Sequence, residues 1–128
     1  MNQIISLKDA IAYTVFAYAT LKEENNKVIY TCEELARKII DAMNNVSIKE
    51  IKTKVKGISV NNKRKLTRKL AVAYAIIAYA TLKKSANRDC IDYQSLINEI
   101  LVVMDLYIPK MALQKADYIL INKADERD

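Results

Sequence analysis

The chain repeats itself. Residues 10–43 align without a gap with residues 71–104, which is a displacement of 61 positions. The best-matched stretches read AIAYTVFAYATLK from Ala10 and AVAYAIIAYATLK from Ala71. A repeat of this length identifies the folding unit, because each copy is one supersecondary unit that buries its apolar face against a neighbour. We therefore expect two similar halves that pack as a pseudo-symmetric pair.

The composition narrows the fold class to all-α. The 128 residues include one glycine and one proline, which leaves almost no turn chemistry for β-hairpins. Apolar residues make up 52% of the chain, enough to predict a packed core rather than disorder. We expect one compact domain over residues 1–128, built from tandem duplicated three-helix repeats with about six helices. Its predicted parts are repeat one at 6–58, a basic connector at 59–66, repeat two at 67–122 and a charged tail at 123–128.

Capping residues place the starts of the helices. Ser6, Thr31 and Ser47 are each followed three residues later by an acidic residue, a pattern typical of a helix N-terminus. In the second copy Asp92 takes the place of Thr31, and Pro109 suits the first turn of a helix. The predicted helices span about residues 7–23, 32–44, 48–56, 63–84, 93–106 and 109–122.

The two longest apolar runs, at residues 10–21 and 70–82, are predicted to form central helices. They are apolar nearly all round, and they are shorter than the roughly 20 residues that a membrane span needs. Residues 1–7 lack the basic region of a signal peptide, so we expect a cytoplasmic protein. The repeated tyrosines lie roughly 140° apart on each helix, which predicts that at least one hydroxyl of each pair reaches a rim: Tyr13 and Tyr18, and Tyr74 and Tyr79.

The residues that catalysis or metal binding would use are scarce. The chain has no histidine, the commonest acid–base group, and no glycine-rich phosphate loop. Cys32 and Cys90 are not equivalent in the two copies, and two thiols without histidine cannot complete a zinc site. We interpret them as small buried apolar residues; a disulfide would require a hyperthermophilic source. We expect no enzymatic activity, no metal and no cofactor.

The positive charge is confined to one segment. Residues 49–70, KEIKTKVKGISVNNKRKLTRKL, contain nine basic residues and one acidic residue, a net charge of +8. The whole chain carries +6, and the parts before and after this segment carry −1 each. Because the copies differ mainly in charge, the first copy is predicted to be the binding copy and the second a scaffold or an assembly surface.

The predicted third helix has an apolar stripe and a cationic side. Ile48, Ile51, Val55 and Ile58 form the stripe, lysines occupy the other faces, and Gly57 suits a left-handed C-terminal turn. Together with EELARKI at residues 33–39, this Ser-capped, Lys-rich helix resembles the helix-turn-helix of DNA-binding domains. The resemblance covers Thr31–Ile58, although the first helix is longer and no glycine marks the turn. It implies that Lys49, Lys52, Thr53 and Lys56 face nucleic acid; the alternative is a merely solvated amphipathic helix.

A second basic cluster, KRKLTRK at residues 63–69, is predicted to begin the fourth helix. Cations at a helix N-terminus oppose the helix dipole and repel one another, and phosphate groups would relieve both penalties. The segment 49–70 has no aromatic residue, so contact with duplex phosphates fits better than base stacking. The predicted nucleic-acid-binding residues are Lys49, Lys52, Thr53, Lys54, Lys56, Lys63, Arg64, Lys65, Arg68 and Lys69.

Three functional hypotheses follow. The first is a small nucleic-acid-binding protein that contacts double-stranded DNA through the third helix and the start of the fourth. The alternative is a helical protein-interaction module, a small subunit of a larger complex or a homodimer, using the apolar surface of Tyr107–Ile121. Attachment to an anionic membrane surface fits less well, because the Lys-rich helix has a thin apolar stripe without Trp or Phe.

Overall fold

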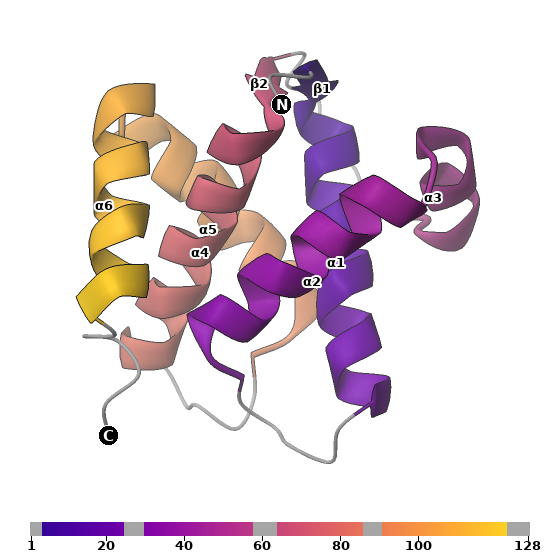
Figure 1. Ribbon diagram of the computed structural model, residues 1–128, viewed down its shortest axis with the longest axis horizontal. Helices are drawn as coiled ribbons and strands as arrows, with labels where there is room; N and C mark the ends of the chain where they lie inside the picture. Colours follow the sequence, from indigo (N-terminus) through magenta and orange to yellow (C-terminus); the bar gives the residue numbers. More distant parts are fainter. Residues whose placement is uncertain (1–3, 25–29, 58–63, 86–90, 123–128) are drawn as a thin grey trace.

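A computed structural model describes residues 4–24, 30–57, 64–85 and 91–122. This part of the chain forms six helices and a two-stranded ribbon, which confirms the predicted all-α fold class (Figure 1). Lys63, Cys90, Ile58 and the predicted tail at 123–128 lie outside the described residues. The elements in chain order are β1 (Ile4–Ser6), α1 (Leu7–Glu24), α2 (Cys32–Asn45), α3 (Ile48–Lys54), β2 (Lys65–Thr67), α4 (Arg68–Ser85), α5 (Tyr93–Leu106) and α6 (Pro109–Asn122).

The helix boundaries follow the spacing of the sequence repeat. α4 and α5 begin and end 61 residues after α1 and α2, and α6 begins 61 residues after α3. Equivalent capping bonds set equivalent starts: the amide of Asp9 donates to Ser6 Oγ at 3.1 Å, and the amide of Leu70 donates to Thr67 Oγ1 at 3.1 Å. Two positions 61 residues apart are called counterparts below.

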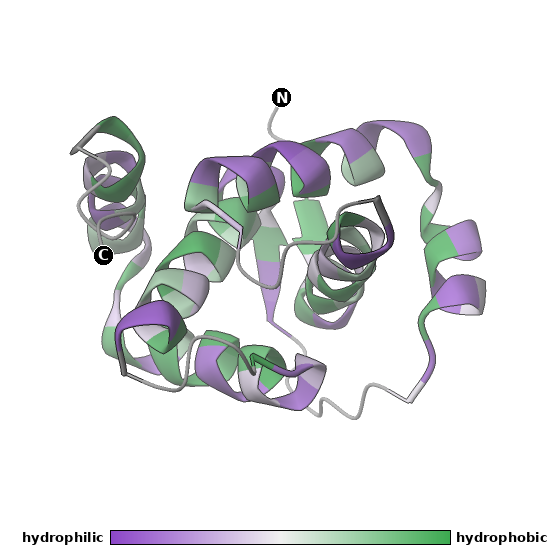
Figure 2. Ribbon diagram, turned by 90° about the horizontal axis from the view of Figure 1, so that it is seen from below, coloured by the Kyte–Doolittle hydropathy of each residue, from purple (hydrophilic) through white to green (hydrophobic). Residues whose placement is uncertain are grey.

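α1 and α4 stand side by side at the centre of the molecule (Figure 1). α1 packs against α2 and α3, α4 packs against α5 and α6, and α2 and α5 each reach across to the other central helix. Figure 2 shows hydrophilic residues on the outward sides of α2 and α3. The core runs along the central helices, where Ile11, Ala75 and Ile76 are buried. The prediction that these two apolar helices are central is therefore confirmed.

The antiparallel ribbon of β1 and β2 was not predicted. Ile5 lies opposite its own counterpart, Leu66, and both side chains are buried. Ser6 lies opposite Lys65 at one end of the ladder. A strand of three residues leaves no period in the sequence, and its partner lies about 60 residues away, so only tertiary contact selects it.

The ribbon also corrects the predicted start of the fourth helix. α4 begins at Arg68, five residues later than predicted, because Lys65–Thr67 pairs with β1. The amide of Leu7 donates to the carbonyl of Arg64 at 2.9 Å and extends this pairing. Arg64 and Lys65 therefore precede the helix, and part of the predicted connector at 59–66 is a strand.

The third helices of the two halves differ in length. α3 ends at Lys54, two residues earlier than predicted, because Val55 is extended with φ −117° and ψ 108°. Gly57 has φ +85°, the left-handed conformation expected from its place after the helix. α6, by contrast, continues to Asn122 and packs along α4. The central helix of the second half is therefore covered over a greater length than that of the first half.

The repeated tyrosines lie in the core rather than at a rim. Tyr13, Tyr18, Tyr74 and Tyr79 have at most 2% of their surface exposed, so the prediction of a rim hydroxyl on each helix was wrong. The hydroxyls can be buried because main-chain groups satisfy them. Tyr13 donates to the carbonyl of Val46 at 2.5 Å, Tyr74 to Tyr107 at 2.9 Å and Tyr18 to Ile91 at 2.9 Å, and the amide of Tyr30 donates to Tyr79 at 2.8 Å.

Two further predictions concern thiols and membranes. Cys32 is fully buried at the start of α2, as expected of a small apolar residue. Among the residues that the structure describes, no helix combines the length and the apolar character that crossing a membrane requires.

Candidate nucleic-acid interface

The structure exposes the basic side chains that the sequence singles out on α3 and directly after it. Lys49, Lys52, Lys54 and Lys56 are all exposed, while Ile51 on the same helix is fully buried against the core. α3 packs on α1, and its cationic side therefore faces solvent. Thr53 is also exposed, but its Oγ1 donates to the carbonyl of Lys49 at 3.2 Å. The predicted stripe is incomplete, since Ile48 is 40% exposed and Val55 is half-buried.

Two of these lysines line a groove with a third that the sequence analysis did not select. This basic groove lies between the start of α1 and the end of α3 and has a volume of about 420 Å³. Among the described residues, none of its three lysines has an ion-pair partner, and the groove also contains one carboxylate, the largely buried Asp9. The lining residues are Ser6, Lys8, Asp9, Ala12, Lys52, Val55, Lys56 and Gly57.

Lys65 extends the basic groove through the ribbon. Lys65 lies opposite Ser6 in the ladder, and Ser6 lines the groove. Side chains alternate across a strand, and Leu66 points into the core, so Lys65 points to the same outer face as Ser6. Opposite side chains of an antiparallel pair begin only about 5 Å apart. The ribbon therefore places one cation of the second predicted cluster beside Ser6 at the edge of the basic groove, although Lys65 itself lines another hollow.

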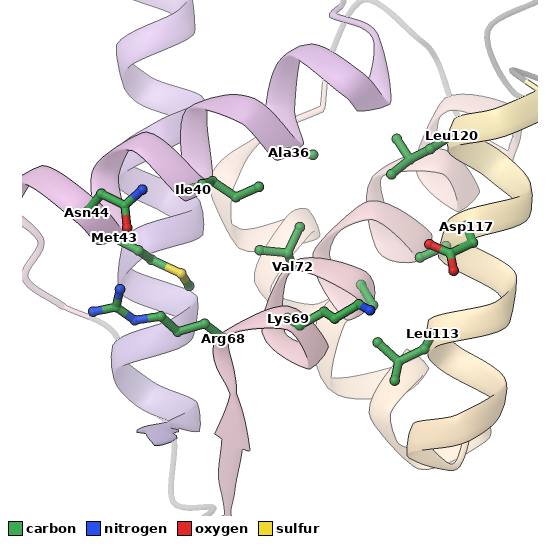
Figure 3. Close-up of a pocket in the computed structure, with 12 residues that line it drawn as sticks. Ala36, Ile40, Met43, Asn44, Arg68, Lys69, Val72, Leu113, Asp117 and Leu120 are labelled. Atoms are coloured by element: carbon green, nitrogen blue, oxygen red, sulfur yellow. The ribbon is translucent and has the colours of Figure 1, made fainter. Parts of the chain in front are cut away.

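Arg68 and Lys69 lie in a different groove. This apolar groove has a volume of about 520 Å³, with α4 as its floor and α2 and α6 as its walls (Figure 3). In Figure 3 Arg68 points toward Asn44 near the end of α2, and Lys69 points toward α6. The lining residues are Ala36, Ile40, Met43, Asn44, Arg68, Lys69, Val72, Ala73, Leu113, Ala116, Asp117 and Leu120.

The two grooves are built from counterpart positions. Lys8 corresponds to Lys69, and Ala12 corresponds to Ala73. Two of the three remaining pairs differ in charge, and they make the first groove more basic than the second. Lys52 corresponds to Leu113, Val55 to Ala116 and Lys56 to Asp117.

Arg64 lines a third hollow, of about 420 Å³, with Lys65, Tyr74 and Tyr107 among its neighbours. Burial raises the pKa of Tyr74, and the positive charge of Arg64 opposes part of that rise. In the other half, burial raises the pKa of Tyr13, and Arg68 opposes part of that rise in the same way. Both arginines are therefore close enough to a core hydroxyl to act on it electrostatically.

The ten predicted residues thus separate into three environments. Lys63 lies outside the described residues, and the other nine surround the basic groove and α3, the apolar groove, or the third hollow. Lys8 was not among the predicted residues, because Lys8 lies outside the basic segment 49–70. Its correspondence to Lys69, a selected residue, was the available signal.

The second half presents apolar side chains to solvent. Of the large apolar residues that are exposed in the described chain, five lie on or beside α6, and the most exposed is Ile121 at 78%. They fall in or next to the stretch Tyr107–Ile121 that the sequence analysis singled out as a protein-contact surface. They are Leu106, Ile108, Met111, Tyr118 and Ile121.

The described residues contain no cluster of three side chains able to hold a metal ion. Comparison with family models, curated proteins and solved structures found no match to this chain. The helix-turn-helix resemblance therefore stays a prediction.

Proposed function

We propose that this protein binds nucleic acid, in particular duplex DNA, through phosphate contacts at the basic groove and along α3. The observation that carries the proposal is the convergence of Lys8, Lys52 and Lys56 on one groove in which no described residue neutralises them by an ion pair. Lysines that line one groove repel one another, and phosphate groups would relieve that repulsion. Their contact with the phosphates would also release the counterions that are condensed on the nucleic acid, which favours binding.

The charge surrounding the groove favours contact with the phosphate backbone of nucleic acid rather than with its bases. Lys49 and Lys54 on α3 and Lys65 on the ribbon add exposed cations beside it. No aromatic residue lines the basic groove, so it offers no platform for stacking single-stranded bases. Lysine contacts phosphate as a point charge, whereas arginine can read a guanine edge with two bonds. Binding of modest sequence specificity is the expected result.

The contrast between the grooves also supports a proposed evolutionary relation. We infer that the chain is a tandem duplication of a three-helix unit around a pseudo-two-fold axis between α1 and α4. Counterparts meet at two levels of this axis: Ile5 pairs with Leu66, and the rings of Tyr18 and Tyr79 pack at 5.9 Å. In this proposal the two copies have diverged, so that corresponding positions line a basic groove in the first copy and an apolar groove in the second.

The test exploits one matched pair of lysines. Lys49 and Lys110 are counterparts in the first turns of α3 and α6, and both are exposed. If six to nine cations contact phosphates, the slope of log affinity against log salt should be about −5 to −8. Lys49→Glu should make that slope shallower by about 1 or more, whereas Lys110→Glu should leave it unchanged. Fluorescence anisotropy with a labelled DNA duplex at several salt concentrations measures both.

A second comparison tests the groove itself. Reversal of Lys52 and Lys56 to Glu should abolish duplex binding, and the fold should survive because exposed charges contribute little to stability. Reversal of Lys110 and Lys115 on α6 should change affinity far less. Equal small effects from the two double variants would show that binding is diffuse. Failure of the parent to bind duplex DNA even at low salt would refute the nucleic-acid proposal.

The exposed apolar residues on and beside α6 support a second function, assembly with a protein. On folded proteins, large patches of exposed apolar residues mark interaction sites, whereas apolar residues exposed singly do not. The partner would be another subunit or a second copy of this chain. Sedimentation of the parent beside Ile121→Lys tests self-association, and a monomeric parent would exclude the homodimer.

A further inference from the structure

The apolar groove has accessible apolar side chains on both walls. Ile40 on the α2 wall is 47% exposed, and Leu113 and Leu120 on the α6 wall are half-buried (Figure 3). Val72 and Ala73 of α4 lie between them. An α-helix, whose diameter with side chains is about 10 Å, presents side chains all round and could contact both walls at once. A helix that inserts an apolar stripe into such a groove is a recurrent mode of peptide recognition.

The charges in the groove define the polar part of that occupant. Arg68 and Lys69 stand where α4 begins, and among the described residues neither has a hydrogen-bond or ion-pair partner on its side chain. The one carboxylate in the lining is Asp117, so cations outnumber anions two to one. A carboxylate on the occupant would neutralise Arg68, which presents a planar donor fork suited to it.

We propose that the apolar groove binds an amphipathic helix of a partner protein, with acidic residues at the end of that helix that lies beside Arg68 and Lys69. This proposal goes beyond nucleic-acid binding and does not depend on it, since the basic groove and the apolar groove lie on different elements. The protein would then hold nucleic acid at the basic groove and recruit a second protein at the apolar groove, which α2, α4 and α6 build together.

The apolar stripe of the partner helix should follow a spacing of three and four residues. Leu113, Ala116 and Leu120 follow that spacing on the α6 wall, and Ala36, Ile40 and Met43 follow it on the α2 wall. Ridges on an inserted helix would pack between these rows as helices do in a protein core. The small Ala73 and Ala116 allow its backbone to approach closely.

The test is selection of peptides on the intact protein. The probe is a displayed library of 16-residue helical peptides with random side chains. The selected peptides should carry an apolar stripe of period three to four and Asp or Glu at one end. Leu113→Lys, which installs the side chain of the counterpart Lys52, should weaken the best peptide by at least about tenfold, because a buried cation is costly. Val102→Lys on α5, at an exposed apolar residue outside the groove, should leave it unchanged.

Charge reversal gives an independent readout. With Arg68→Glu and Lys69→Glu together, the same library should return peptides with Lys or Arg at that end. Circular dichroism of every variant confirms that the helices are intact. The proposal is overturned if no helical peptides are enriched, if their end charge does not respond to the reversal, or if Val102→Lys abolishes binding while Leu113→Lys does not. Two other outcomes would also overturn it. One is a dimeric parent that Leu113→Lys dissociates, and the other is a groove that binds the fatty acid laurate but no peptide.

Discussion

At the scale of single residues, tyrosine hydroxyls join distant parts of the backbone. Tyr13 and Tyr74 each donate to the residue that ends the second helix of their own half, Val46 and Tyr107. Tyr18 instead crosses to the other half and donates to Ile91. A buried carbonyl left without its donor costs about 1–3 kcal/mol, so each of these bonds fixes a backbone position. These tyrosines are structural, and we expect their replacement by Phe to leave nucleic-acid affinity unchanged.

Tyr18 also predicts a loss of stability in alkali. Burial raises the pKa of Tyr18 from 10.0 to about 12, so the native state favours the neutral hydroxyl. Its contribution to stability is fully present below pH 10 and is lost as the pH rises from 10 to about 12. Urea unfolding at pH 9, 10 and 11 should show a falling free energy of unfolding in the parent and a shallower fall in Tyr18→Phe. Parallel curves for the two proteins would contradict this assignment.

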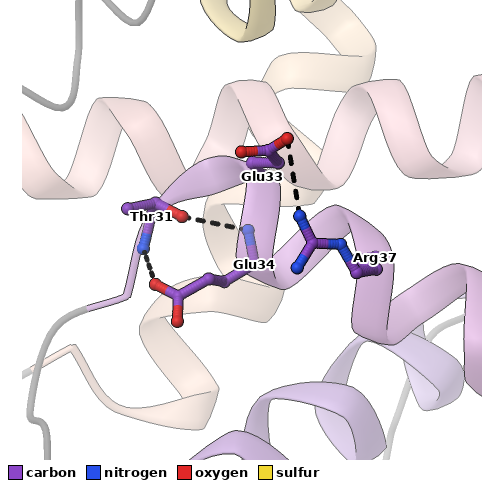
Figure 4. Close-up of polar contacts among 4 residues, drawn as sticks. All are labelled: Thr31, Glu33, Glu34 and Arg37. Carbon is purple, nitrogen blue, oxygen red and sulfur yellow. Dashed lines mark hydrogen bonds and ion pairs between the residues drawn. The ribbon is translucent and has the colours of Figure 1, made fainter.

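At the scale of elements, local polar bonds decide where helices begin. Thr31 and Glu34 form a reciprocal capping box at the start of α2 (Figure 4). The amide of Glu34 donates to Thr31 Oγ1 at 3.0 Å, and the amide of Thr31 donates to Glu34 Oε1 at 2.9 Å. Glu33 and Arg37, which lie one turn apart on α2, form an ion pair at 3.4 Å, and both side chains are more than half exposed. The box satisfies main-chain donors, whereas the ion pair joins groups that water already solvates.

Two variants of α2 separate these contributions. Thr31→Ala should lower the free energy of unfolding by about 1 kcal/mol, because the amide of Glu34 loses its acceptor, Thr31 Oγ1. Arg37→Ala should change it by less than about 0.5 kcal/mol, as exposed ion pairs contribute little. Urea unfolding of both variants beside the parent measures the difference. A larger loss from Arg37→Ala than from Thr31→Ala would show that the ion pair, not the cap, holds the start of α2.

At the scale of the whole molecule, the two halves share one core. α1 contacts α4 and α5, and α4 contacts α2, so each central helix is buried partly by the other half. The rings of Tyr18, Tyr30 and Tyr79 pack edge to face where the halves meet, with the amide of Tyr30 donating to Tyr79. Neither half can expose its side of this contact without also exposing the side that belongs to the other half.

This shared core predicts one cooperative unfolding transition. Tyrosine fluorescence, to which the rings at the junction contribute, and circular dichroism, which reports on helices, should give coincident curves in urea. Tyr79→Ala should shift the midpoints of both curves equally to lower urea concentration, because the ring of Tyr79 lies between the halves. Two separated transitions in the parent would mean that the halves fold as independent units.

The sequence by itself determined the helical elements and the character of their surfaces. Five of the six predicted helix starts agree with the structure, because a capping side chain acts within four residues of the position that it specifies. The exposure of the lysines on α3 also follows from local periodicity, since buried Ile51 fixes which side of the helix faces inward.

Only the tertiary structure decided which cations share a groove. Pairing of β1 with β2 moved the start of the fourth helix to Arg68 and placed Lys65 beside Ser6. Packing of α3 on α1 brought Lys8 to Lys52, while packing of α6 on α4 gave Lys69 an apolar wall instead. Residues far apart in the chain meet only when helices pack, so no local pattern could separate the basic segment into its three environments.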